Sequence, residues 1–337
     1  MPHMPQAPLQ TGSAWYGRDL ADRQDWLYRL SDTEIQELAA EVRRTARLMA
    51  DSGRGLIDLT AADFRFRHLR RALERWTDSL RRGYGFVQIK GWPAADFSEQ
   101  ENSLAYWSIG LMLGRPVPQN TDGDVLGHIR DTGADPEDPS VRLYKTRARQ
   151  DFHADGSDII GLMCLHPAKA GGESKLVSSV TIFNEVLVRR PDLAPLLFEP
   201  FCFDLHEQQA PGAKPYWTMP ICSYGPAGLR TWFAEWYIRM AQRHPEVPRL
   251  TPEQNELIDL IVRIANDPEI HLDIEFDVGD MQFLKNAVIL HARGAYEDHD
   301  DPARKRHLLR LWLARPDFDD GDAGLREGIR SRQEVHA

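Results

Sequence analysis

The stretch DFHADGSDIIGLMCL, residues 151–165, holds the two patterns that decide the fold of this 337-residue chain. It closes with an apolar, β-branched run at residues 159–165, which is typical of a strand buried on both faces. It opens with His153 and Asp155, and residues two apart on a strand point to the same face. A histidine and a carboxylate placed in this way can supply two of the three ligands of a 2-His-1-carboxylate metal site.

Strand patterns dominate from about residue 140 onward, and helix patterns lie mainly before it or as insertions. The expected strands cover residues 84–90, 142–146, 159–165, 175–180, 201–205, 219–224, 270–276, 281–285, 288–292 and 307–314. The expected helices cover residues 31–50, 62–80, 97–112, 182–190, 232–242 and 252–266. The order lacks the regular βαβ alternation of a parallel sheet. It predicts a mixed α/β chain with a mainly β core, a barrel or jelly roll with a helical N-terminal region and helical insertions.

Composition and charge narrow the class of protein. The 41 Lys and Arg residues against 51 Asp and Glu residues give a net charge of −10, which argues against a nucleic-acid partner. No apolar run approaches the ~18 residues of a membrane span, and the N-terminus lacks a signal-peptide pattern. Three cysteines without CxxC spacing predict neither a disulfide framework nor a zinc knuckle. We expect a cytoplasmic protein with a loose arm at 1–25, a single domain at 26–316 and a charged tail at 317–337, its oligomeric state left open.

The His-x-Asp pattern occurs three times, and context separates the three copies. The copy at residues 299–301 lies in an acidic, turn-like segment that is typical of a solvated surface. The copy at residues 271–273 lies on the polar face of an alternating strand, which we expect to be exposed. Only the copy at His153 and Asp155 borders a buried strand and is followed by His291 at the end of a further apolar strand. We therefore take these three residues as the candidate metal ligands.

A strand near the C-terminus carries two arginines on one face. In RHLLRLWL, residues 306–313, alternation places Arg306, Leu308, Arg310 and Trp312 together, opposite a face of His307 and leucines. Two guanidinium groups in an otherwise apolar strand are costly to bury without anionic partners. The face is either exposed or paired with carboxylates of the chain, or it binds the carboxylates of a ligand through bidentate arginine contacts.

With these segments in view, the run from about residue 144 to 316 resembles the TauD/TfdA (taurine dioxygenase-like) family of Fe(II)- and 2-oxoglutarate-dependent oxygenases. The segments that carry the resemblance occur in the family's order: FHAD at 152–155, AGGES at 170–174, GD at 279–280, LHAR at 290–293 and RHLLR at 306–310. The resemblance implies a double-stranded β-helix, or jelly roll, with His153, Asp155 and His291 as iron ligands. It further implies that Arg306 grips the distal carboxylate of 2-oxoglutarate, helped by Ser174 where the family often has threonine. Arg310 would lie near the keto-acid end or an anionic group of the substrate.

The resemblance also implies the chemistry, in which the cofactors supply reactivity and the protein supplies geometry. Fe(II), 2-oxoglutarate and O2 would oxidise, and by default hydroxylate, a C–H bond of a small polar molecule, with release of succinate and CO2. Two alternatives stay open: a zinc hydrolase with the same three ligands, and a silent protein that only binds 2-oxoglutarate. Candidate substrate contacts come from the long loop, from a segment suited to form a lid and from the iron-site strand: Gln119, His128, Arg130, Tyr144, Tyr216, Trp217 and Asn286.

Overall fold

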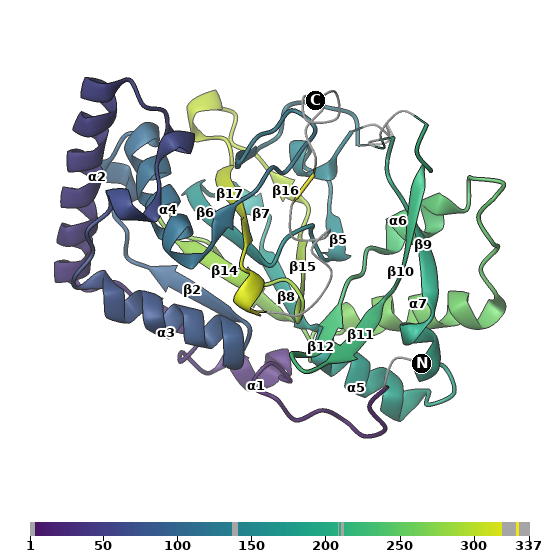
Figure 1. Ribbon diagram of the computed structural model, residues 1–337. Helices are drawn as coiled ribbons and strands as arrows, with labels where there is room; N and C mark the ends of the chain where they lie inside the picture. Colours follow the sequence, from purple (N-terminus) through teal and green to yellow (C-terminus); the bar gives the residue numbers. More distant parts are fainter. Residues whose placement is uncertain (1–3, 137–140, 208, 210–211, 319–327, 330–337) are drawn as a thin grey trace.

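The computed structural model describes residues 4–136, 141–207, 209, 212–318 and 328–329, and its centre is a pair of β-sheets that face each other (Figure 1). The large sheet runs in the order β1-β2-β14-β6-β17-β3, with β4 also paired to β17. Its pairings are antiparallel except for β1 with β2. The bounds are β1 Leu27–Arg29, β2 Phe86–Lys90, β3 Arg115–Pro116, β4 Leu126–Ile129, β6 Ile159–His166, β14 Met281–Lys285 and β17 His307–Ala314.

The small sheet has four strands in the order β13-β8-β15-β5, all antiparallel. Three two-stranded ribbons, β9 with β10, β11 with β12 and β7 with β16, extend the β structure. The strands of the small sheet are β5 Gln150–His153, β8 Ser174–Ser178, β13 Leu272–Ile274 and β15 Ile289–Arg293. The ribbons are β7 Ala170–Gly171, β9 Pro200–Asp204, β10 Tyr216–Pro220, β11 Cys222–Gly225, β12 Gly228–Thr231 and β16 Tyr296–Glu297. This is the expected jelly-roll core of a mixed α/β chain.

Helices cover the outer sides of the sheets. The helices α2, α3 and α4 lie over the large sheet, while α5, α6 and α7 lie at the other end of the molecule (Figure 1). The bounds are α1 Gly17–Ala21, α2 Asp32–Ser52, α3 Leu69–Arg82, α4 Glu99–Leu113, α5 Ser179–Arg189, α6 Glu235–Ala241 and α7 Pro252–Ala265. No helix within the described ranges is both long enough and apolar enough to cross a membrane.

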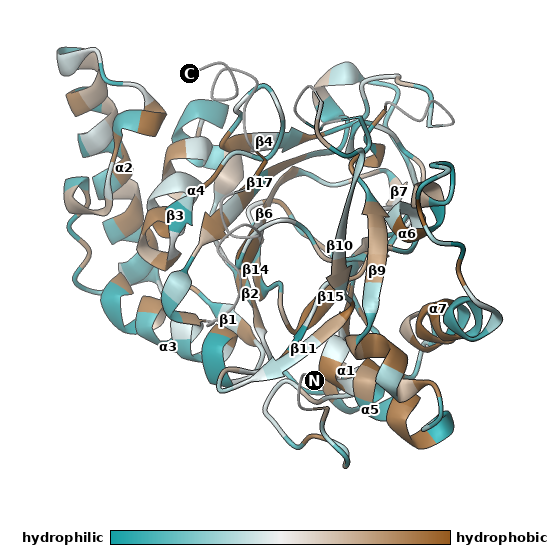
Figure 2. Cartoon of the chain, turned by 45° about the vertical axis from the view of Figure 1, so that its right-hand side comes forward, coloured by the Kyte–Doolittle hydropathy of each residue, from teal (hydrophilic) through white to brown (hydrophobic). Residues whose placement is uncertain are grey.

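The alternation of side chains along β17 divides the core in two. Leu309, Leu311 and Leu313 pack in the cluster that also contains the apolar faces of α2, α3 and α4. Trp312 points the other way, into the cluster formed with the small sheet. Figure 2 shows hydrophobic residues on the strands of the interior and hydrophilic residues on the outer turns of α3. The interior between the two sheets is therefore where β5, β15 and β17 bring their polar side chains.

The segment expected as a strand at residues 142–146 is instead a short 3-10 helix, Leu143–Lys145. Its backbone bonds are local, with the Lys145 and Thr146 N–H groups donating to the Arg142 and Leu143 carbonyls, and the Arg293 guanidinium donates to the carbonyl groups of Leu143, Thr146 and Ala148. The helix expected from residue 62 begins only at Leu69. The Glu37 carboxylate of α2 accepts the backbone N–H groups of residues 67–69 and so fixes where α3 starts.

The N-terminal segment is packed and not a loose arm over the residues described. Trp15 and Leu20 are buried, and the Trp15 indole N–H donates to the Tyr84 carbonyl at 2.8 Å. Gly17 donates its N–H to the Ile270 carbonyl, and a Cβ at Gly17 would lie 1.8 Å from the His271 carbonyl oxygen. The composition of this segment predicted a flexible arm. In the structure, Trp15, Leu20 and Gly17 instead pack closely against the rest of the protein. The expected C-terminal tail lies mostly outside the described residues.

Candidate active site

His153, Asp155 and His291 meet at the end of β5. His291 on β15 pairs directly with His153 on β5, so the two imidazole rings lie with centroids 4.2 Å apart. Asp155 Oδ1 is 3.7 Å from His153 Nε2, and Asp155 Oδ2 is 3.5 Å from His291 Nε2. One ligand atom from each residue lies within 4.8 Å of the others, and the three side chains are almost fully buried. The spacing, the chemistry and the burial fit a 2-His-1-carboxylate metal site.

Neighbouring groups fix the orientation of the three side chains. The ring of His153 hydrogen-bonds through Nδ1 to the Asp151 carbonyl at 2.8 Å, which leaves Nε2 to face the site. The Asn286 side chain accepts the Asp155 backbone N–H at 2.9 Å and donates to the Asp155 carbonyl at 2.6 Å. The Trp312 indole N–H donates to Asp155 Oδ2 at 3.0 Å. Asp155 is thus held at its backbone and at one of its two carboxylate oxygens.

Electrostatics keep the candidate ligands in the protonation states that a metal requires. Burial and the charge of His291 lower the pKa of His153 to about 3, so its ring is neutral at pH 7. Burial alone would raise the pKa of Asp155, but the positive charge of Arg310 and the contact with His291 outweigh it and hold that pKa far below its usual value. Metal ligands must be deprotonated, and these two already are.

A small pocket of about 50 Å³ lies between the two candidate histidines and Arg306, and Ser174 and Arg310 also line it. Arg306 is 5% exposed, stacks over the Tyr296 ring at 4.9 Å and makes a long hydrogen bond of 3.5 Å to the Gly172 carbonyl. Its Nη1 is buried without a partner among the described residues. A buried guanidinium with spare donors needs an anion. The Ser174 hydroxyl donates to Gln282 Oε1 at 3.0 Å and can still accept.

Arg310 is fully enclosed between the pocket and the carboxylate of the metal site. Its Nη1 is 3.7 Å from Asp155 Oδ2, and its guanidinium lies over the rings of Tyr144 and Trp312. Gln119 binds the same arginine twice, accepting from Nε at 2.7 Å and donating to the carbonyl oxygen at 2.8 Å. Burial lowers the pKa of Arg310, and the charge of Asp155 opposes that shift. Arg310 therefore neutralises part of the charge of Asp155.

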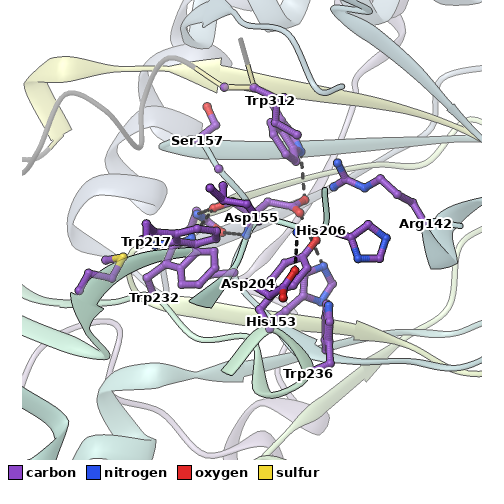
Figure 3. Close-up of a pocket in the computed structure, with 18 of the residues that line it drawn as sticks. Arg142, His153, Asp155, Ser157, Asp204, His206, Trp217, Trp232, Trp236 and Trp312 are labelled. Carbon is purple, nitrogen blue, oxygen red and sulfur yellow. Dashed lines mark hydrogen bonds and ion pairs between the residues drawn. The ribbon is translucent and has the colours of Figure 1, made fainter. Parts of the chain in front are cut away.

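A large cavity of about 1320 Å³ opens on the other side of Asp155. In the view of Figure 3, Trp217 and Trp232 lie on one side of Asp155, and Arg142 and His206 lie on the other. The rings of Trp217 and Trp232 meet edge to face at 5.1 Å, and Trp236 approaches His153 at 5.1 Å. The triad therefore lies between a small pocket that ends in a cation and a large cavity with an aromatic wall.

The cationic side of the large cavity has unused donors. Arg142 Nη1 and both ring nitrogens of His206 are buried without partners among the described residues. Burial and the nearby charge of Arg142 lower the pKa of His206. His206 has a left-handed backbone with φ of 51°, and its N–H is held by Asp204 Oδ1 at 2.6 Å. Strain of this kind in a non-glycine residue is characteristic of functional sites.

The structure divides the predicted substrate residues into two groups. Tyr144, Trp217 and Asn286 line the large cavity. The other four do not line it: Gln119 holds Arg310, His128 hydrogen-bonds to His307, Arg130 is exposed and Tyr216 lies near His244. Sequence spacing placed all seven near the site, but it could not show which way each side chain points.

The two rejected His-x-Asp copies have structural roles. His271 hydrogen-bonds to the Ala265 carbonyl at 3.1 Å, and Asp273 forms an ion pair with Lys175. His271 is buried, with 8% exposed, so of this His-x-Asp pair only Asp273 has the exposure expected for the polar face. Asp301 accepts the N–H of Ala303 in a 3-10 turn. Neither copy belongs to a three-ligand cluster within the described part of the chain.

Several cavity residues were not singled out from the sequence. Arg142, His206, Trp232 and Trp236 line the cavity from a loop and from the region of α6. The aromatic density of TWFAEWY, residues 231–237, was the one signal that could have indicated them. The alternation of side chains along residues 306–313 predicted that Trp312 lies on the same strand face as Arg306 and Arg310. It did not predict the hydrogen bond from Trp312 to Asp155.

A jelly roll that holds two histidines and a carboxylate beside a buried arginine defines an Fe(II)- and 2-oxoglutarate-dependent dioxygenase. The comparisons with known proteins agree: residues 52–312 match the model of the taurine catabolism dioxygenase TauD, TfdA family. The chain belongs to this family. Its members combine iron, 2-oxoglutarate and dioxygen, which are the cofactors that the site requires.

Relatives and solved structures are consistent with this placement. The chain is 29% identical over 315 residues to FR-33289 synthase of Streptomyces rubellomurinus, covering 91% of this chain and 90% of that protein. It is 25% identical to a uridine-5'-phosphate dioxygenase of an Amycolatopsis species, over 68% of this chain and 85% of that one. The oxygenase OrfP, solved with Fe and alpha-ketoglutaric acid, superposes with a TM-score of 0.64 at 15% identity, covering 90% of this chain and 99% of that chain.

Proposed function

We propose that this dioxygenase hydroxylates a small molecule that carries an anionic group, with His153, Asp155 and His291 as the iron ligands. The observation that carries the proposal is the position of the triad between two cavities of different size and lining. The small pocket suits a short dicarboxylate, and the large cavity suits a substrate that presents a C–H bond to the same centre. Both cavities include His153 in their walls.

In this proposal Arg306 binds the distal carboxylate of 2-oxoglutarate. Its unpartnered Nη1 and the accepting capacity of Ser174 lie in the small pocket. His153, Asp155 and His291 would hold an iron ion, which would supply the oxidation of the substrate C–H bond by dioxygen with conversion of 2-oxoglutarate to succinate and carbon dioxide. Trp312 donates to Asp155 Oδ2, and the two carboxylate oxygens face the two histidines, Oδ1 toward His153 Nε2 and Oδ2 toward His291 Nε2.

The protein contributes position and the exclusion of water. Arg310 and Gln119 form a buried pair behind the carboxylate, so the charge of Asp155 is balanced without mobile ions. Trp217, Trp232 and Trp236 line the large cavity with apolar surface, which shields a bound substrate from bulk solvent. A positioned substrate presents one C–H bond to the centre, and that position determines which carbon is oxidised.

The positions of Arg142 and His206 in the large cavity support the proposal that the substrate carries an anionic group. Arg142 Nη1 and the ring nitrogens of His206, one of which carries an N–H in the neutral ring, have no partner among the described residues, and both side chains face the large cavity (Figure 3). A carboxylate, phosphate or phosphonate would pair with these donors, while the tryptophans would contact the rest of the molecule. A relative named for uridine-5'-phosphate is consistent with such a group. Three free cysteines support a reducing, cytoplasmic setting.

Oxygen uptake coupled to succinate formation tests the reaction. The purified chain with Fe(II) and 2-oxoglutarate is mixed with a panel of anionic small molecules and with neutral analogues of the same shape. We expect succinate to form with members of the anionic set and the product to gain one oxygen atom by mass spectrometry. Binding of iron and 2-oxoglutarate without succinate from any panel member would favour a silent binding protein, and metal-dependent hydrolysis without oxygen uptake would favour a zinc hydrolase.

Arg142→Met tests the substrate half separately. We expect the KM for an anionic substrate to rise by ~10–100-fold, since a hydrogen bond to a charged group contributes ~1.5–3 kcal/mol. The KM for 2-oxoglutarate should stay unchanged because Arg142 does not line the small pocket. An unchanged KM for an anionic substrate would refute the role of Arg142 and leave the assignment of the iron site untouched.

A further inference from the structure

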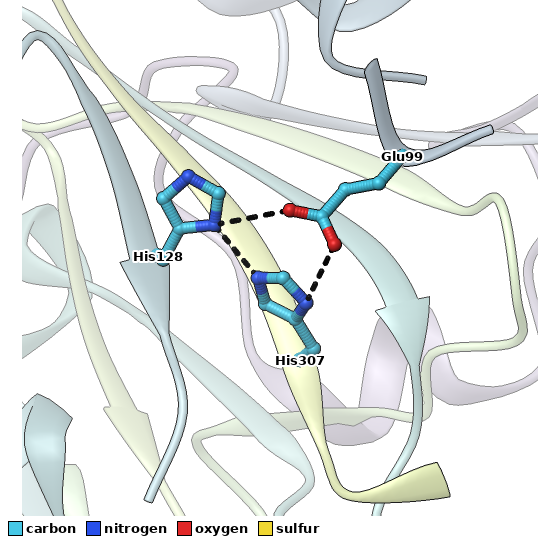
Figure 4. A group of neighbouring side chains, drawn as sticks. All are labelled: Glu99, His128 and His307. Carbon is cyan, nitrogen blue, oxygen red and sulfur yellow. Dashed lines mark hydrogen bonds and ion pairs between the residues drawn. The ribbon is translucent and has the colours of Figure 1, made fainter. Parts of the chain in front are cut away.

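A second group of metal-ligating side chains lies outside both cavities. Glu99 in the first turn of α4, His128 on β4 and His307 on β17 meet at one edge of the large sheet (Figure 4). One ligand atom from each lies within 4.8 Å of the others. None of the three lines the large cavity or the small pocket. The active site leaves this cluster unexplained.

The distances within the cluster bracket those of a zinc site. His128 Nδ1 is 2.8 Å from His307 Nε2, and Glu99 Oε1 is 3.9 Å from His128 Nδ1. Glu99 Oε2 is 4.0 Å from His307 Nδ1, beyond hydrogen-bond reach. A tetrahedral zinc ion with bonds of ~2.0–2.1 Å separates its ligand atoms by ~3.3 Å. His307 faces His128 through Nε2 and Glu99 through Nδ1, so one of these two nitrogens would bind the ion, and a rotation of the exposed Glu99 and His128 side chains would bring the three ligand atoms to corners of that tetrahedron.

The burial of the three side chains is graded from the core to the solvent. The side chain of His307 is 8% exposed, that of His128 39% and that of Glu99 59%. A metal ion could therefore enter from solvent, bind to a fixed histidine and close the two more mobile ligands around it.

The protonation states favour a cation. Burial lowers the pKa of His307 to about 4 and lowers that of His128 as well, so both rings are neutral at pH 7. Glu99 supplies a negative charge, which Asp124 reinforces and Arg130 partly offsets near His128. Metal ions bind neutral imidazole and ionised carboxylate, which are the forms present here.

The geometry points to a second metal site, formed by Glu99, His128 and His307, that binds Zn2+ independently of the iron site. Two imidazoles and one carboxylate in a tetrahedral arrangement match the ligand preference of zinc. Bound zinc would connect the start of α4 to β4 and to the first residue of β17. It would then stabilise the edge of the large sheet next to Arg306, which directly precedes β17.

Isothermal titration with ZnCl2 tests the proposal, with the candidate iron ligands removed by His153→Ala and His291→Ala. We expect this double variant to bind one zinc ion per chain and to gain melting temperature from it. Adding His128→Ala or Glu99→Gln should weaken zinc binding at least tenfold and abolish the gain. His166→Ala is the matched control, because His166 is exposed and pairs with His307 across the sheet without belonging to the cluster.

The wild-type chain provides a measurement that does not depend on the double variant folding. It should bind two zinc ions in the absence of iron, and His128→Ala should bind one. Absence of zinc binding in the folded double variant, or equal zinc affinity with and without His128→Ala, would overturn the proposal. A loss from His166→Ala as large as that from His128→Ala would overturn the assignment of the ligands.

Discussion

Replacement of Arg306 by methionine separates ligand binding from fold stability. Arg306→Met keeps an apolar side chain of similar length and removes the charge. In the structure this guanidinium forms no ion pair with any carboxylate of the described residues, and its polar contact through Nη2 is the 3.5 Å bond to the Gly172 carbonyl. Its hydrogen-bonding capacity is therefore largely reserved for a ligand.

The expected magnitude follows from that geometry. A carboxylate held by two nitrogens of the guanidinium gains two hydrogen bonds to a charged group, each contributing ~1.5–3 kcal/mol. The sum of ~3–6 kcal/mol corresponds to a ~10²–10⁴-fold loss of affinity, at ~1.4 kcal/mol per factor of ten. Without a ligand the buried cation is unpaired, so its removal should not lower the melting temperature of the free protein.

Two measurements on the same variant check this reasoning. The KM for 2-oxoglutarate is obtained from succinate formation, and the melting temperature is recorded with and without 2-oxoglutarate. At a concentration of 100 times Kd a ligand stabilises the fold by ~2.7 kcal/mol, so the wild-type chain should show a clear thermal shift. We expect Arg306→Met to lose this shift and to melt no lower than the wild-type chain when both are free of ligand.

Control variants refine the interpretation. Arg306→Lys retains the charge without the planar fork and should give an intermediate KM. Arg304→Met removes an exposed arginine two residues away and should leave the KM unchanged. A KM for 2-oxoglutarate in Arg306→Met within about threefold of the wild-type value would refute the assignment of this pocket. A large fall in the melting temperature of the free variant would instead show that Arg306 has a structural role.

Further predictions address the metal ligands, the thiols and pH. His153→Ala should reduce turnover by far more than the ~10–100-fold loss that is typical when a residue behind a metal ligand is removed. His271→Ala should leave the turnover of the folded enzyme nearly unchanged. Equal losses in the two variants would mean that the metal site was assigned to the wrong His-x-Asp motif. At pH 8 a thiol reagent should modify one cysteine per native chain, Cys202, and three after unfolding, because burial raises the pKa of both other thiols to about 12; rapid labelling of all three in the native chain would contradict this. The melting temperature of the metal-free chain should fall as the pH falls from about 6.5 toward 4. Burial lowers the pKa values of His153 and His307 in the folded chain, so in this range the unfolded chain binds more protons than the folded chain does. A constant melting temperature between pH 7 and pH 5 would argue against neutral buried rings.

The local sequence pattern was sufficient to predict those features of the site that depend on the geometry of a single strand. Alternation along residues 306–313 correctly separated the two arginines and Trp312 from the leucines of the opposite face. The i, i+2 spacing of His153 and Asp155, together with the later His291, correctly identified three metal-ligating side chains that meet in the structure. These features depend on strand geometry, which the residues themselves dictate.

Pairings between distant residues could not be predicted from pattern. Gln119 and Arg310 lie 191 positions apart, and nothing local to Gln119 indicates that it binds an arginine. The strand expected at residues 142–146 was wrong, because this segment forms a 3-10 turn whose carbonyl groups accept hydrogen bonds from Arg293, far along the chain. The position of His128 outside the large cavity, hydrogen-bonded to His307 across the β4–β17 pair, could not be read from the local sequence either.

The bond between Trp312 and Asp155 bears on how this enzyme can evolve. Loss of the Asp155 carboxylate would open a position beside the candidate metal site that a small anion such as a halide could enter. Asp155→Gly here would leave the Trp312 indole and the Arg310 guanidinium buried without their nearest anion, a loss of ~3–5 kcal/mol for a broken buried pair. A halide would have to accept from both groups, or a second mutation would have to remove them. The contacts of Trp312 and Arg310 therefore make the Asp155 carboxylate costly to replace, independently of its role as a metal ligand.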